Sequence, residues 1–217
     1  MLLLAALLAA APAGPAQDYR LAQDAHGPGI TVSLQYTFGT HEVRALRALG
    51  EVRFDPDAPG SMAGTFRVPI DDLKSDNAER DCHMREALGL DYTRSRYPKE
   101  HVCAGDALPP GMVAYPEILL EVRGAQAPAV ATLAVGRETP VVLDAVWTVH
   151  GVRRPAKLAL TVSREARTPG ALRIRGAAPI RLSDFAVVVK SATIVFVTSS
   201  VDEVANVHFD LTLAPER

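Results

Sequence analysis

The feature that most constrains this fold is a repeated alternation of apolar and polar residues along much of the chain. In residues 30–38 every second side chain is apolar or aromatic, and the side chains between them are polar. Successive side chains of a strand point to opposite faces, so a period of two indicates a strand with one face in water. The same period recurs in residues 66–70, 117–122, 143–149, 157–162 and 206–213.

Turn sequences separate these predicted strands, and helical periodicity is nearly absent outside residues 77–88. The turns include Asp55-Pro56-Asp57, His150-Gly151, Thr168-Pro169-Gly170 and Val201-Asp202-Glu203. This spacing predicts an all-β fold, either a sandwich or a closed barrel, and closure is preferred because it leaves no open sheet edge. With 217 residues, of which 48% are hydrophobic, the chain suits one domain with a sizeable core. We therefore expect a single antiparallel barrel over residues 30–217.

One short helix is predicted at residues 77–88. Asp76 can act as its N-cap with Glu79 three residues later, and Gly89 can end it in a left-handed conformation. A long irregular stretch follows at residues 90–114 and contains three prolines. Loops of this length in compact domains are usually functional, pinned or disordered.

Five motifs occur in an order that resembles the YceI-like family over roughly residues 30–213. They are Phe38–Val43 with Gly50–Pro56, the strand and helix of Phe66–Gly89, Tyr115–Ile118, Trp147–Pro155 and Leu182–Phe185. The resemblance implies a lipocalin-like barrel whose interior holds a long apolar chain, typically a polyisoprenoid, in an extracytoplasmic compartment. The insertion at residues 90–114 departs from the family pattern, in which the helix passes quickly to the Tyr-Pro strand.

On this resemblance we expect an apolar tunnel with a polar mouth. The predicted tunnel residues are Phe38, Phe54, Phe66, Val68, Leu120, Trp147, Val149, Leu160, Phe209 and Leu211. The predicted mouth and head-group residues are Asn77, Arg80, His41 and His150. Arg80 could instead pair with Asp76 or Asp81, and His150 could be a hairpin residue bonded to the backbone. The alternation alone leaves open a filled barrel that uses the 90–114 insertion as a partner-binding surface.

The two cysteines allow three interpretations. In an exported chain, Cys82 and Cys103 are expected to form a disulfide that closes a loop of about 20 residues. Cys82 and His83 together with His101 and Cys103 could instead hold zinc, although this ligand spacing is unusual. The third interpretation is that both thiols are free. The disulfide is our prediction, so we expect no metal and no cofactor other than a non-covalently bound lipid.

Catalytic motifs are missing from the sequence. There is no Gly-x-Ser-x-Gly elbow, His-Glu-x-x-His pair, Walker loop or Gly-x-Gly-x-x-Gly. The carboxylate pairs fall in predicted turns, where solvated residues are common. We therefore expect a binding protein with no catalytic residues, and keep a Cys/His-dependent enzyme as the weaker alternative. A net charge of −2 and a pI of 6.3 argue against a nucleic-acid partner.

The N-terminus resembles an export signal. Residues 1–16 are apolar or small, the run Leu2–Ala10 is too short to cross a bilayer, and Ala11-Pro12-Ala13 or Gly14-Pro15-Ala16 offers a cleavage site. The stretch lacks the usual Lys or Arg, so a disordered or helical extension is the alternative. We expect residues 17–29 to lead to the first strand, no other membrane-spanning segment, and a periplasmic or secreted protein. The residues do not decide between a monomer and a homodimer.

Overall fold

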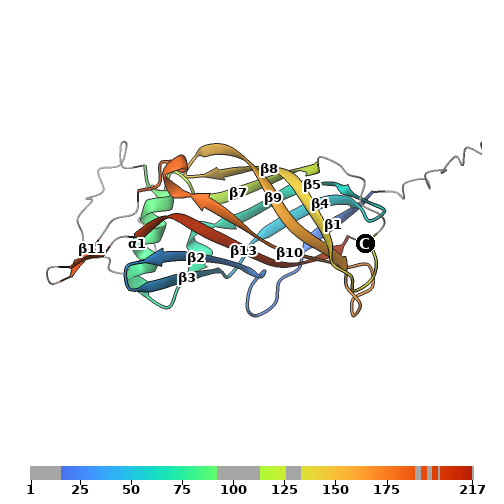
Figure 1. Ribbon diagram of the computed structural model, residues 1–217, viewed down its shortest axis with the longest axis horizontal. Coiled ribbons are helices and arrows are strands. Elements are labelled where there is room, and N and C mark those ends of the chain that lie inside the picture. The colour runs from blue at the N-terminus through green and yellow to red at the C-terminus, as the bar shows by residue number, and fades with distance from the viewer. Residues whose placement is uncertain are drawn as a thin grey trace, which may run out of the picture.

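The computed structural model describes residues 16–91, 113–125, 133–188, 192–194, 197–199 and 201–216. Within these residues the structure is almost entirely β, with one α-helix and two 3-10 helices (Figure 1). The strands are β1 Gln17–Leu21, β2 Ile30–Tyr36, β3 Gly39–Ala45, β4 Leu49–Asp55, β5 Ala58–Pro69, β6 Leu73–Lys74, β7 Glu117–Ala125, β8 Thr139–Val149, β9 Val152–Arg164, β10 Leu172–Arg181, β11 Ala192–Ile194, β12 Val197–Ser199 and β13 Val201–Pro215. The helices are η1 Ile70–Asp72, α1 Ala78–Gly89 and η2 Leu182–Phe185.

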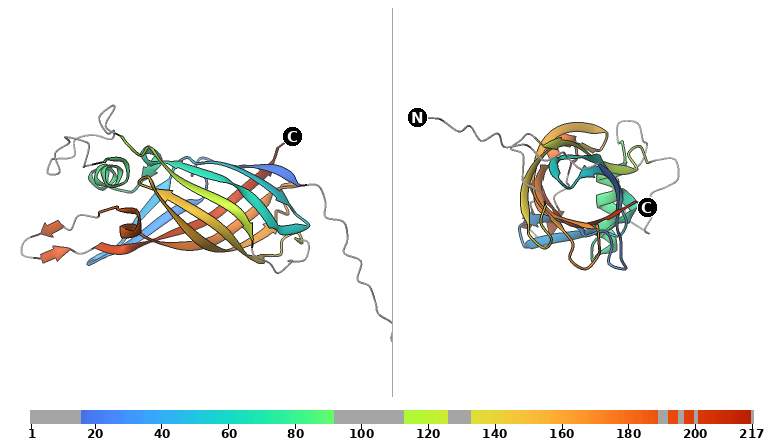
Figure 2. Two further views of the ribbon diagram at one scale, coloured as in Figure 1. Left: turned by 90° about the horizontal axis from the view of Figure 1, so that it is seen from above. Right: turned by 90° about the vertical axis from the view of Figure 1, so that its right-hand side faces the viewer.

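The strands close into an antiparallel barrel, as the sequence predicts. The ring runs β1, β4, β5, β7, β8, β9, β10 and β13, and β1 completes it by pairing with both β4 and β13. The view along the barrel in Figure 2 shows this ring. Closure satisfies the backbone groups that an open sheet would leave at its edges.

The two ends of the barrel are built from different strands, because β13 has two partners on the same side. Its C-terminal residues 213–215 pair with β1, whereas its residues 205–209 pair with β2. We call the end formed by β1 and β4 the floor end. We call the end formed by β2, β3 and β6, with α1 beside them, the mouth end (Figure 2).

The floor end is packed solid with apolar side chains. Tyr19 of β1 and Phe54 of β4 are fully buried and meet edge to face, with ring centroids 6.0 Å apart. Behind them, β4 and β5 come very close: a Cβ on Gly64 would lie 2.2 Å from the backbone oxygen of Glu51. Only glycine permits this approach, which lets the sheet curve tightly here.

The outer face of the barrel carries charged pairs between adjacent strands and, in one case, across an intervening strand. Arg153 of β9 pairs with Glu121 of β7, and Lys157 of β9 pairs with Asp144 of β8. Arg173 of β10 donates to Asp210 of β13 at 2.6 Å. Exposed pairs of this kind contribute little to stability, but they match the alternation that puts charged residues on the wet face.

Three sequence predictions need correction. The first strand is β1 at Gln17–Leu21, whereas the sequence predicts that the first strand starts at residue 30. Only Tyr19 and Leu21 of β1 point inward, so this strand is too short to show a period of two. Residues 201–203 belong to β13, where the register with β2 shifts between Val201 and Ala205. The helix is confirmed within one residue, but its N-cap is Asn77 and Gly89 is its last residue.

Residues 92–112 of the predicted 90–114 insertion lie outside the described residues, but both of its ends are described. Leu90 and Val113 form an antiparallel bridge, and the N–H groups of Ala114 and Tyr115 both donate to the carbonyl of Gly89. The insertion therefore leaves and returns at one point, at the C-terminal end of α1.

Candidate functional site

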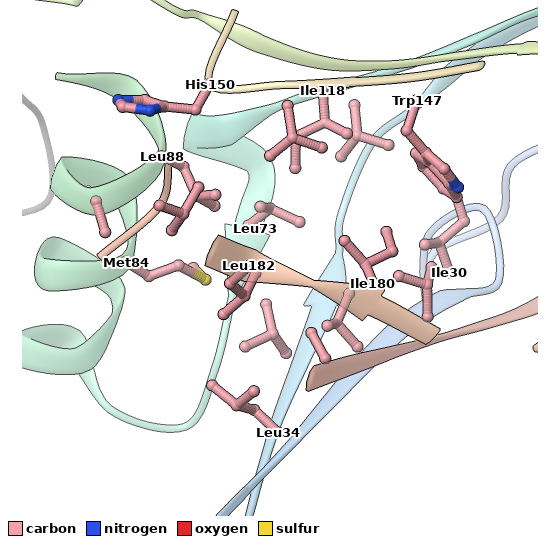
Figure 3. Close-up of a pocket in the computed structure, with 18 of the residues that line it drawn as sticks. Ile30, Leu34, Leu73, Met84, Leu88, Ile118, Trp147, His150, Ile180 and Leu182 are labelled. Carbon is pink, nitrogen blue, oxygen red and sulfur yellow. The ribbon is translucent and has the colours of Figure 1, made fainter. Parts of the chain in front are cut away.

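The barrel contains a cavity of about 1340 Å³ that extends inward from the mouth end (Figure 3). This volume exceeds the roughly 300–1,000 Å³ of pockets for drug-sized ligands. The inward rows of β2, β5, β7, β8, β9, β10 and β13 line the cavity, and α1 contributes Met84, Ala87 and Leu88. The filled interior of the alternative hypothesis is therefore wrong for the described part of this chain, and its partner-binding role for the 90–114 insertion stays a prediction.

Nine of the ten predicted tunnel residues line this cavity. They are Phe38, Phe66, Val68, Leu120, Trp147, Val149, Leu160, Phe209 and Leu211. Trp147 and Phe209 stack across the interior with ring centroids 6.3 Å apart. Phe38 follows β2 at the tip of the β2–β3 hairpin and is 59% exposed, so it stands at the rim. Contact of these residues with a lipid stays a prediction.

The prediction for Phe54 is wrong in its placement. The side chain points inward, as the alternation indicates, but it does not line the cavity. It is 0% exposed and packs against Tyr19 in the floor end. Alternation identifies the inward face of a strand, but it does not say where along that strand the barrel is hollow.

Several lining residues were missed in the sequence. Ile174 and Ile180 come from β10, in which Leu172, Ile174, Ala178 and Ile180 alternate with outward residues. β10 has the same period of two, but Gly176 interrupts its inward row, so the pattern is harder to recognise. Met84, Ala87 and Leu88 share one helical face at spacings of three and four residues, which is a readable signal in a helix otherwise rich in charge.

The polar lining is confined to the mouth end. All charged, amide and imidazole groups among the lining residues come from α1 and its flanking segments or from the β2–β3 and β8–β9 hairpins. Farther in, the lining is apolar apart from the indole of Trp147. Its Nε1 is buried and has no hydrogen-bond partner in the described part of the chain. The interior therefore suits an apolar guest, and the mouth suits a polar end.

Arg80 connects the start of α1 to the barrel rim. Its Nη1 donates to Oδ1 of Asp76 at 3.1 Å and lies 2.9 Å from Nδ1 of His41 on β3. The His41 ring stacks on Tyr36 of β2, with centroids 3.9 Å apart and planes 6° apart. The predicted pair of Arg80 with Asp76 is thus present, and it coexists with the contact to His41.

The His41 imidazole is held in its neutral form. A guanidinium has no acceptor, so Nδ1 must accept the hydrogen bond from Arg80, and the ring proton must sit on Nε2. Burial lowers the pKa of His41 below its usual 6.5, and the nearby Arg80 charge lowers it further, while Asp76 acts in the opposite direction. Neutral His41 and cationic Arg80 therefore form the polar rim on this side of the mouth.

Asn77 and His150 hold the two ends of α1. The Asn77 Oδ1 accepts from the backbone N–H of Arg80 at 2.9 Å and caps the helix. The His150 Nε2 donates to the carbonyl of Leu90 at 2.8 Å, and its ring meets Tyr115 at 4.5 Å. Both residues line the cavity as predicted, but their hydrogen bonds show that each also fixes the position of the helix.

Buried charge lies beneath α1. Asp81 accepts hydrogen bonds from the backbone N–H and the hydroxyl of Ser75, both at 2.7 Å. Arg85 is fully buried with its Nε 4.0 Å from Asp71, and the buried Glu86 lies 3.5 Å from Nδ1 of His83. The contacts of Asp81 with Ser75 and of Arg85 with Asp71 fasten the helix to η1 and to the segment that follows β6, whereas the contact of His83 with Glu86 lies within the helix.

Cys82 is buried in α1, and Cys103 lies outside the described residues, so the disulfide stays a prediction. His101 of the zinc alternative lies outside them as well. Among the described residues no group of three or more His, Cys, Asp or Glu side chains is placed to hold a metal ion. No helix within the described ranges is long and apolar enough to cross a bilayer.

Comparison with known proteins gives one family match. A family model described as a YceI-like domain matches residues 23–213. No curated protein matches the chain.

Several solved structures share the fold at low sequence identity. A polyisoprenoid-binding domain from Saccharophagus degradans, described as implicated in plant cell wall breakdown, has 15% identity and a TM-score of 0.60 over 91% of this chain and 98% of that one. BcnA from Burkholderia cenocepacia has 12% identity and a TM-score of 0.58 over 86% and 95%. The YceI protein of Campylobacter jejuni has 13% identity and a TM-score of 0.51 over 81% and 84%.

Proposed function

The chain belongs to the YceI-like domain family, and from this membership we propose that it binds an isoprenoid or similar long-chain lipid inside its barrel. The family is one of binding domains rather than enzymes, and a solved polyisoprenoid-binding domain has the same fold. We propose no catalytic step for this protein. Its ligand is held by burial and not by covalent chemistry.

The observation that carries the proposal is the separation of polar and apolar lining along one cavity. The interior rows are apolar from β2 round to β13, and charged groups gather only at the mouth end. A lipid would enter with its tail first and leave its polar end beside α1. Each methylene buried in such a cavity contributes about 0.8 kcal/mol, so the tail supplies most of the affinity.

A polar head group would meet Arg80 at the mouth. Asp76 and His41 occupy its Nη1, whereas its Nε and Nη2 have no partner in the described part of the chain. Two parallel N–H groups of this kind suit a phosphate or a quinone oxygen. Arg80 is therefore the head-group contact that we propose, with Asn77 and His41 beside it.

We also propose that the protein works outside the cytoplasm. The support is the apolar stretch at residues 1–16, which has the length and the small-residue ends of a signal peptide. An oxidising compartment would allow Cys82 and Cys103 to form their disulfide. Intact mass before and after reduction would test both features on protein purified from its own host.

The binding proposal can be tested with the chain's own fluorescence, because Trp147 is its single tryptophan and lines the cavity. Protein stripped of lipid would be titrated with farnesol, a neutral prenyl alcohol. We expect a saturable change in Trp147 emission as the chain displaces water. Lipid extraction and mass spectrometry of untreated protein would then identify the natural ligand.

Adjacent leucines on β7 supply a matched pair of variants. Leu120 lines the cavity, whereas Leu119 points outward from the same strand. Leu120→Asn should weaken farnesol binding by about tenfold or more, because it places an unpaired amide in the apolar wall. Leu119→Asn should bind like the wild type. Equal affinities in the two folded variants, or no emission change in the wild type, would contradict the proposal.

A further inference from the structure

Along the strands, the inward side chains change from lining the cavity to packing against one another within one residue pair. On β10 and β13, Ile174 and Leu211 are paired and both line the cavity. The next inward pair toward the floor end is Leu172 and Leu213, and neither residue lines it. On β9, Leu160 lines the cavity and Val162 does not. The cavity therefore ends in a defined wall.

A large aromatic side chain behind this wall comes from β4. Arg53 of β4 pairs with Ala63 of β5, and a shift in register follows between Arg53 and Asp55. Phe54 and Met62 are therefore the inward residues next to the Arg53–Ala63 pair on the floor side. Met62 lines the cavity and Phe54 lies behind it, 0% exposed and in edge contact with Tyr19. Phe54 thus occupies the space into which the cavity would otherwise continue.

The wall is also closely packed. Tyr19, Phe54, Leu172 and Leu213 are each at most 1% exposed. Packed interiors do not yield easily to an extra group, since added volume forces side chains off their preferred rotamers. A guest that reaches this wall cannot extend farther without displacing it.

We propose that Phe54, backed by Tyr19, sets the longest chain that the cavity accepts. The inference rests on the proposed lipid-binding function and on entry with the tail first. The head group stays beside Arg80 at one end, and the tail meets Met62 and Phe54 at the other. The distance between these two ends then sets the preferred chain length, as a molecular ruler. Shorter chains leave part of the apolar lining uncovered, and longer chains push the head group away from the rim.

The ruler predicts opposite shifts from two kinds of substitution. Phe54→Ala removes the stop and lets the tail pass Met62, which should move the preferred length to a longer prenol. Each methylene newly buried is expected to raise affinity about fourfold. Ile174→Phe adds bulk on the cavity side of the wall and should move the preferred length to a shorter prenol.

The experiment is a series of all-trans prenyl alcohols, increasing by one isoprene unit at a time, titrated against each variant through Trp147 emission. Phe54→Leu is a milder second variant, in case Phe54→Ala does not fold, and should shift the optimum in the same direction. Phe185→Ala is the matched control, because it removes the same atoms from a buried site that does not line the cavity. Its length optimum should equal that of the wild type.

The outcomes separate the ruler from the function on which it rests. A shift to longer prenols in a folded Phe54 variant, with no shift in Phe185→Ala, supports the ruler. Binding of prenols with one unchanged optimum in Phe54→Leu and Ile174→Phe would overturn it and leave the proposed function in place. Failure of every prenol to change the emission of wild-type Trp147 would overturn both.

Discussion

The floor end and the mouth end of this barrel use the same alternating strands for different purposes. At the floor end the inward side chains of β1 and β4 meet one another, and Tyr19 and Phe54 leave no space between them. At the mouth end the inward side chains of β2 and β3 face an open cavity, and α1 lies beside it. The difference shows that a strand's pattern decides which side chains point inward, while its partners decide whether they touch.

The two ends also differ in how polar groups are held. The mouth end contains buried Asp81, Arg85 and Glu86 beneath α1 and the Arg80 contact with His41. The floor end is closed mainly by aromatic and aliphatic packing, and its buried carboxylate, Asp55, accepts from the backbone N–H of Asp57. Stability should therefore depend most on the floor, and ligand affinity on the mouth and on the side chains that line the cavity.

The largest expected effect comes from removing the same atoms at each end. Leu213→Ala empties a fully buried site in the floor, and we expect a loss of about 3 kcal/mol in the free energy of unfolding. Leu88→Ala on α1 faces a cavity that is already open, so its loss should be about 1 kcal/mol or less. Urea unfolding of both variants, stripped of lipid, measures the difference.

The same two variants should rank in the opposite order for binding. Leu88→Ala removes a side chain that lines the cavity and should weaken farnesol binding, whereas Leu213→Ala should leave it close to that of the wild type while folded. Equal stability losses at the two sites would mean that α1 is packed as tightly as the floor, and the comparison would fail.

Much of this fold follows from the sequence because the alternation is long and regular. Residues 30–38, 143–149 and 206–213 show the period clearly, and each lies in a strand or its hairpin with the predicted side inward. The pattern fails where it is short or broken. β1 has two inward residues, and the row of β10 is interrupted by Gly176, so neither strand was predicted.

The site was predicted less completely than the fold. Tunnel residues come from the alternation and the family resemblance together, but the position of the wall depends on pairing between distant strands. Phe54 shows this limit: its inward direction was readable, yet its place behind Met62 depends on the register of β4 with β5. The contact of His41 with Arg80 joins residues 39 positions apart and has no local signal.

A smaller effect is expected at the start of α1, where sequence and structure disagree about the cap. Asn77→Ala removes the acceptor for the N–H of Arg80 and should cost about 1 kcal/mol in the free energy of unfolding. Asp76→Ala, which removes an exposed partner of Arg80, should cost less than half of that. A larger loss from Asp76→Ala would show that Asp76 is the cap in solution.

The smallest effect, a pH dependence, should arise at the mouth and not at the floor. Tyr19, the titratable member of the floor's aromatic pair, has a pKa raised by burial, so it stays neutral below its usual value of 10. His41 at the mouth has a pKa lowered by burial and by Arg80. Asp76 acts against this shift, and Tyr36 of β2 stacks on the ring.

The sign follows from the two states of His41. Above its unfolded pKa of 6.5, the ring is neutral in both the folded and the unfolded chain, and the contact with Arg80 is complete. As pH falls below 6.5 the unfolded chain takes up a proton before the folded chain does, so the free energy of unfolding decreases until the lowered folded pKa is passed. Protonation would also place a donor on Nδ1 opposite the Arg80 guanidinium, and break the contact.

Comparison with His41→Gln isolates this contribution, because glutamine can accept from Arg80 but does not titrate. The difference in unfolding free energy between wild type and His41→Gln should become less favourable to the wild type between pH 7.5 and pH 5. His208→Gln, on the exposed outer face of β13 beside Ser33 of β2, serves as the control for a histidine that does not line the cavity. If the difference between wild type and His41→Gln stays constant with pH, Arg80 does not hold the His41 ring in solution.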